Sequence, residues 1–124
     1  IKEKVPNDLA VVKGELTSQD TDGWSTLMNC ASSHIYLKQM NRKCESALEN
    51  GAEPVRVLSS VLGQNYPSDE LEYSWKKLMQ NHPHDSICCC SVDEVQDEMA
   101  TRFNKSKQVA DYLVSEGTRY IADS

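Results

Sequence analysis

The chain has 124 residues, of which 39% are hydrophobic and 26% are charged, a composition typical of one soluble globular domain. Its net charge of -6 argues against a nucleic-acid or anionic-membrane surface, because both of these partners require a basic patch. No apolar run approaches the roughly 20 residues that a membrane-spanning helix needs, and no basic-then-apolar signal segment opens the chain.

The cysteines indicate a reducing compartment. There are five of them, at Cys30, Cys44, Cys88, Cys89 and Cys90. Three consecutive cysteines cannot all reach separate partners with normal disulfide geometry. A secreted scaffold would space its cysteines and pair them. We therefore predict a cytoplasmic protein.

Residues 1–30 predict an extended segment that has no partner in this chain. The stretch 9–16 is rich in β-branched and aliphatic residues, which favours one short strand, and 17–23 is polar and typical of a turn. No second convincing strand follows with which the first could pair. The segment therefore indicates a piece of a larger protein.

Residues 31–124 have the spacing of helices. In the first predicted helix, Ser32 or Ser33 is the N-cap and Asn50-Gly51 is the stop. Its apolar residues recur every three or four positions and share one face, namely Leu37, Met40, Cys44, Ala47 and Leu48.

Two further helices are predicted before Pro83. The second is short, begins near Pro54, ends at Gly63 and carries the apolar residues Val57, Leu58, Val61 and Leu62. The third has Ser68 as its N-cap and ends before Pro83, since proline disfavours helical geometry in the preceding residue. One side of this third helix presents Leu71, Trp75, Leu78 and Met79.

The last predicted helix is the longest. Ser91 and Glu94 have the spacing of a capping box at its start. An apolar stripe then runs almost to the end of the chain through Val92, Val95, Met99, Phe103, Val109, Leu113, Tyr120 and Ile121. Three long amphipathic helices with short connections predict an all-α three-helix bundle, with one short extra helix as an option.

The segment 81–91 between the last two helices concentrates side chains of the kinds that bind ligands. It holds two of the three histidines, three of the five cysteines and one carboxylate. Loops of this kind between rigid elements are common sites of function. In the simplest interpretation the segment is only a connector, with its histidines bonded to backbone or solvent and its cysteines acting as small buried hydrophobes.

Two other interpretations are open from the residues alone. One is a self-contained structural zinc site made by His82, His84, Cys88 and Cys90, although these pairs are closer together than the usual zinc-finger spacings. The other is a partial catalytic site, in which one imidazole and the next carboxylate face a cleft whose other wall lies elsewhere.

Residues 81–95 read NHPHDSICCCSVDEV. This string resembles a signature of glycoside hydrolase family 38, whose members of bacterial type read N-H-P-H-D-S-I-C-G-C-S-x-D-E-V here. Residues 32–38 resemble the family's S-S-R-x-Y-L-K, and residues 14–16 resemble the G-E-L that ends its catalytic domain. The family's pattern also fits residues 75–78, Met99, Arg102 and Phe103. The resemblance covers nearly the whole chain, and its histidine-bearing part is highly specific.

The resemblance implies a zinc-dependent retaining α-mannosidase that hydrolyses terminal α-mannosidic bonds. In this family the histidine directly before the aspartate is a zinc ligand, so His84 is the candidate metal ligand. The aspartate contacts hydroxyls of the bound mannose, so Asp85 is the candidate substrate contact. His82 matches the bacterial pattern without an implied ligand role. The remaining zinc ligands, the nucleophile and the general acid belong to an upstream α/β domain, and no H-x-D pair occurs here.

The resemblance also implies the surroundings of the chain. Residues 1–30 would end the catalytic α/β domain, and residues 31–124 would be the helical middle domain. This domain would pack against the catalytic domain and C-terminal β domains, would meet a mannose-containing oligosaccharide or glycoside, and would be inactive alone. The alternative function is a stand-alone helical interaction module or a small structural zinc-binding domain.

Three positions depart from the family's pattern. Cys89 stands where glycine is usual, and it would strain the loop if that position has a positive φ. His34 replaces an arginine, which removes a permanent charge and a fork of donors. Gln96 stands where histidine is frequent, and we interpret it as neutral surface variation.

Overall fold

The computed structural model of the chain describes residues 8, 9, 11, 13, 30 and 32–124. Its helices are α1 (Ile35–Ala47), η2 (Leu48–Ala52), α2 (Glu53–Val61), α3 (Ser68–Met79), α4 (His84–Ile87) and α5 (Asp93–Asp123). These described residues contain no strand. The predicted strand at 9–16 and turn at 17–23 lie largely outside them, and the predicted boundary between residues 30 and 31 stays a prediction.

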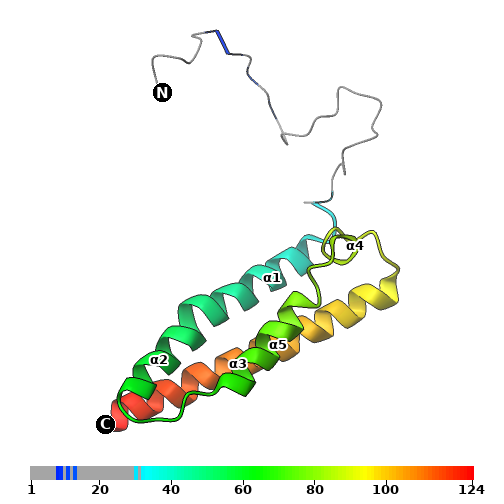
Figure 1. Cartoon of the computed structure of the whole chain (residues 1–124). Helices are drawn as coiled ribbons and strands as arrows, with labels where there is room; N and C mark the ends of the chain where they lie inside the picture. Colours follow the sequence, from blue (N-terminus) through cyan, green and yellow to red (C-terminus); the bar gives the residue numbers. More distant parts are fainter. Residues whose placement is uncertain (1–7, 10, 12, 14–29, 31) are drawn as a thin grey trace.

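The prediction of an all-α three-helix bundle is confirmed. The helices α1, η2 and α2 follow one another as a continuous rod, α3 returns along it, and α5 spans the bundle (Figure 1). α4 lies at one end, beside the start of α1 (Figure 1). The C-terminus lies at the other end, beside α2 (Figure 1).

The core has the alternating spacing of coiled-coil packing. α5 buries one residue at alternating steps of three and four: Gln96, Met99, Phe103, Ser106, Ala110, Leu113 and Gly117. This spacing keeps one narrow stripe of the long helix against its two partners. Phe103, Leu37, Leu48 and Leu78 are among the largest fully buried side chains, and they belong to one apolar cluster.

The predicted apolar stripe of α5 is partly wrong at its beginning. Met99, Phe103 and Leu113 are buried as predicted, but Val92 and Val95 are exposed. The buried stripe instead begins at the polar Gln96 and includes small residues. Burial on a helix depends on the direction in which a side chain points around the axis. A polar residue that points inward is therefore buried, while an apolar neighbour that points outward is not.

The sequence predicts that Asn50-Gly51 stops the first helix, and this prediction is wrong. The chain continues through a π-helical turn, η2, directly into α2. A Cβ atom at Gly51 would lie 3.0 Å from Cγ2 of Val114 on α5. The glycine therefore permits a close approach of two helices at the π-helical turn.

The end of α2 is predicted correctly, whereas its apolar residues are not core residues. Gly63 has a φ of 107°, its N–H bonds the Ser60 carbonyl, and the next N–H bonds the Ser59 carbonyl, which is a Schellman motif. The residues that α2 buries are Arg56 and Ser59. The apolar residues that the sequence assigns to this helix are all exposed, namely Val57, Leu58, Val61 and Leu62, whereas Val55 is half-buried.

None of the predicted side-chain caps is confirmed. The N-cap of α1 is His34 instead of Ser32 or Ser33, and Ser68 is the first residue of α3 instead of its cap. α5 begins after Val92 without a side-chain cap, so the capping box of Ser91 and Glu94 is wrong. On α3, Leu71 and Leu78 are buried and Trp75 packs against the core, but Met79 is exposed.

Candidate functional site

The candidate site lies at one end of the bundle, in the segment that connects α3 to α5. Asn81 is fully buried there, and its Nδ2 donates to the Met99 carbonyl oxygen at 3.0 Å, which fixes the segment to α5. Pro83 has an extended conformation with φ -48° and ψ 137°, and its carbonyl accepts from Ser86 and Ile87. The predicted connector is therefore a single turn of helix, α4, held between two rigid helices.

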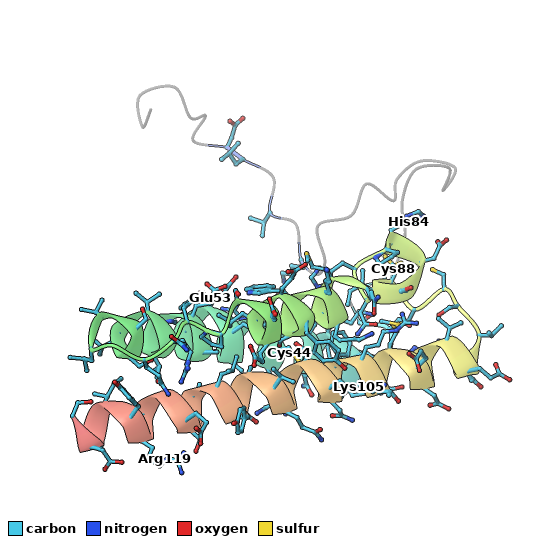
Figure 2. All side chains as sticks on the ribbon, turned by 60° about the horizontal axis from the view of Figure 1, so that its bottom comes forward. Cys44, Glu53, His84, Cys88, Lys105 and Arg119 are labelled. Carbon is cyan, nitrogen blue, oxygen red and sulfur yellow. The ribbon has the colours of Figure 1, made fainter. Side chains whose placement is uncertain are left out.

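His84 and Asp85 lie on the exposed side of this turn. His84 Nε2 is 3.2 Å from Asp85 Oδ1, and the two side chains are 82% and 75% exposed. Figure 2 shows His84 on the side of α4 that faces away from the bundle. The pair therefore makes only a weak mutual contact in solvent, and both groups are open to ligands from outside the bundle.

His82 faces a different direction and has a structural partner. Its Nε2 lies 2.8 Å from Oδ1 of Asn41 on α1. The bond joins the start of the segment to the first helix. That His82 has no ligand role stays a prediction.

The self-contained zinc site is not supported by the geometry. In the part of the chain that the structure describes, no group of three or more His, Cys, Asp or Glu side chains could hold a metal ion. All four residues of that hypothesis, His82, His84, Cys88 and Cys90, belong to the described part. His82 is turned towards α1, while His84 faces solvent. In the described residues these four side chains therefore do not come together as one set of ligands.

Cys89 stands where the backbone requires a left-handed residue. Its φ is 63°, its N–H bonds the Ser86 carbonyl, and the Cys90 N–H bonds the Asp85 carbonyl. These bonds form a Schellman motif that ends α4, and glycine is the preferred residue at that position. Because a side chain there costs roughly 1–2 kcal/mol, the predicted strain at this departure is confirmed. Lys38 Nζ contacts the Cys89 sulfur at 3.2 Å, which joins the turn to α1.

The described cysteines are all free, and the thiols of Cys30, Cys88 and Cys90 lie close enough to interact. Burial, then the charge and hydrogen bonding of Cys88 and Cys90, raises the pKa of the Cys30 thiol. Cys44 is buried in the core, where burial raises its pKa and its thiol donates to the Phe103 carbonyl oxygen. The reducing compartment and the cytoplasmic location stay predictions.

The other two departures lie at the same end of the bundle. His34 adopts a left-handed conformation with φ 43° at the start of α1, and its Nδ1 lies 3.0 Å from Ser33 Oγ. Gln96 is 4% exposed, and its Nε2 donates to the Ser91 carbonyl oxygen at 2.9 Å. The interpretation of Gln96 as surface variation is therefore wrong. This amide was missed because its partner is a backbone atom, which no sequence pattern displays.

The fold and the site define a helical domain that presents one imidazole and one carboxylate at one end of the bundle. A family model described as the alpha-mannosidase middle domain matches residues 25–121. The chain is 50% identical over 122 residues to a protein of Halalkalibacterium halodurans named as a candidate mannosylglycerate hydrolase. The match covers 98% of this chain and 13% of that protein.

Two solved structures from Enterococcus faecalis have the same fold. One is described as an alpha-mannosidase, with a TM-score of 0.81 and 50% identity over 99% of this chain and 14% of that one. The other is described as a protein of glycosyl hydrolase family 38, with a TM-score of 0.75 and 43% identity over 98% and 13%. The chain belongs to the alpha-mannosidase middle domain family, within glycoside hydrolase family 38.

The chain spans about a seventh of the length of these relatives. None of the helices in the described part of the chain is both long and apolar enough to cross a bilayer.

Proposed function

We propose that the chain is the helical middle domain of a zinc-dependent retaining α-mannosidase that hydrolyses terminal α-mannosidic bonds. The observation that carries this proposal is the exposed pair His84–Asp85 on a rigid turn, in a chain that spans a seventh of its hydrolase relatives. A stand-alone interaction module has no comparable support, because the relatives extend far beyond this domain.

The donor set of the turn fits a shared zinc ion. A catalytic zinc takes about three protein ligands and keeps a further position for substrate. His84 offers an imidazole nitrogen that is free of packing constraints, and the described residues around it form no competing metal site. His84 would therefore be one ligand, with the others on the catalytic domain. When bound, the zinc supplies Lewis acidity and orients mannose hydroxyls.

Asp85 would hold the sugar. An ionised carboxylate is a pure acceptor with two oxygens, so it suits two neighbouring sugar hydroxyls. Its place next to His84 on one helical turn fixes the distance between the metal ligand and the sugar contact. The covalent chemistry of a retaining glycosidase needs a nucleophile and a general acid. Both would come from the catalytic domain, and Asp85 contributes orientation of the ring.

The test is turnover of a mannoside by the full-length parent protein. His84→Ala and Asp85→Asn should each lower kcat/KM by at least ~100-fold, which is the usual scale for lost positioning contacts. His82→Ala is the matched control because it lies two residues from His84 and bonds Asn41 outside the pair. Wild-type turnover in either test variant, or no glycosidase activity in the parent, would overturn the proposal.

A further inference from the structure

A second surface, at the opposite end of the bundle, is not explained by the site. Four aliphatic residues of α2 and its C-cap are exposed: Val57 by 50%, Leu58 by 51%, Val61 by 77% and Leu62 by 46%. We call these four residues the α2 patch. Their spacing of one, three and one places them on one side of the helix.

The α2 patch is the reverse of what a free helix would present to solvent. The inner side of α2 is largely polar, since it buries Arg56 and Ser59, and Val55 is half-buried beside Gly117 of α5. Arg56 Nη1 donates to Gln64 Oε1 at 2.8 Å and Nη2 donates to the Asn65 carbonyl oxygen, so its polar inner side is held in place. An outward aliphatic side on a helix with a polar inner side indicates a covered surface in the intact protein.

The end of α5 lies beside this patch. Tyr120 Oη donates to the carbonyl oxygen of Leu62 at 3.4 Å. Figure 1 shows the C-terminus next to α2, at the end of the bundle opposite to α4. Polypeptide that continues beyond Ser124 in a longer parent would therefore leave the bundle next to the α2 patch.

We propose that the α2 patch is the docking surface for the domain that follows Ser124 in the parent protein. This inference rests on the proposed function, in which the chain is a middle domain. The relatives are about seven times as long as the chain, so most of the parent's surface lies outside this domain. The partner surface would be apolar and uncharged, because four aliphatic side chains offer it no hydrogen-bonding group.

The size of the patch favours a tethered partner over a second copy of the chain. A stable dimer buries about 800 Å² on each subunit, which four half-exposed aliphatic side chains cannot supply. A covalently attached domain needs less area, because a short linker gives it an effective concentration in the millimolar range.

The experiment is site-specific photo-cross-linking in the full-length parent. The photoreactive residue p-benzoylphenylalanine is placed at Val61, and in a second variant at Val57 in case the first does not fold. The control position is Tyr112, which is 60% exposed on α5 outside the patch. Peptide mass spectrometry after irradiation then identifies the residues that are linked.

The expected result is a cross-link within one polypeptide from Val61 to a residue beyond Ser124, and none to that region from Tyr112. A link to residues before Ile1, a link between two polypeptides, or no link from either patch position would overturn the inference. Mannoside turnover by the unmodified parent is measured separately. An active parent without the expected link refutes the docking surface alone, whereas an inactive parent refutes the proposed function.

Discussion

Two adjacent residues at the start of α5 provide a sharp test of the structure, because their chemistry and their burial point in opposite directions. Val95 is apolar and 37% exposed, whereas Gln96 is polar and 4% exposed. Gln96 also donates to the Ser91 carbonyl oxygen at 2.9 Å, which holds the end of the site segment against α5. Replacing each residue in turn with alanine shows whether burial or apolar character decides its contribution to stability.

The magnitude for Gln96→Ala follows from two losses. The hydrogen bond to Ser91 is worth about 1 kcal/mol net, and its loss leaves a carbonyl oxygen without this partner. The missing buried side-chain atoms cost roughly 1–2 kcal/mol more. We therefore expect the free energy of unfolding to fall by about 2–3 kcal/mol. For Val95→Ala, a small loss of apolar contact is offset by the better helix propensity of alanine, about 0.5 kcal/mol, so the net change is near zero.

Urea unfolding of the 124-residue chain, followed by circular dichroism at the helical band, gives both values. The two variants are compared at equal slopes of the unfolding transition, so that the difference in midpoint reports a difference in stability. A loss in Val95→Ala that equals or exceeds the loss in Gln96→Ala would contradict the described placement of α5.

Two further predictions concern stability. Gly63→Ala forces a side chain into a backbone with φ 107°, and it should lower the Tm by roughly 4–8 °C, as for a loss of about 1 kcal/mol; an unchanged Tm in thermal unfolding would refute the conformation of this turn. Burial raises the pKa of the Cys44 thiol from its ordinary value of 9.0, so above that pH the unfolded chain ionises while the folded chain keeps its proton. The free energy of unfolding should therefore fall as pH rises through the folded pKa, and less steeply in Cys44→Ala; equal slopes in urea titrations between about pH 8 and 10 would contradict this.

The fold class could be predicted from the sequence because it depends on many residues at once. The three- and four-residue spacing over residues 31–124 is repeated in every long helix, so single errors do not change the result. The stop at Gly63 was also predictable, since glycine at a helix end carries a specific conformational preference.

The sequence-based predictions that are wrong concern features decided by tertiary packing. Asn50-Gly51 has the composition of a helix stop, but Gly51 faces Val114 and allows two helices to approach. Val92, Val95 and Met79 are apolar yet lie at outward angles. No local pattern distinguishes a glycine that ends a helix from one that fits against a neighbour.

The candidate site was indicated by the resemblance and could not be derived from spacing. From the residues alone, a connector, a structural zinc site and a partial catalytic site were all open. The structure does not bring the four residues of the second together, because His82 bonds Asn41 while His84 faces solvent. The strain at Cys89 was anticipated from the missing glycine, and its cause is the Schellman motif that ends α4.

The central claim is that this domain supplies one zinc ligand, His84, to a site shared with the rest of the parent. The most direct test is the zinc content of the purified full-length parent, measured by mass spectrometry, for His84→Ala and for the matched control His82→Ala. We expect near wild-type zinc in His82→Ala and a large loss in His84→Ala. Equal zinc content in the two variants, whether both retain it or both lose it, would contradict the claim.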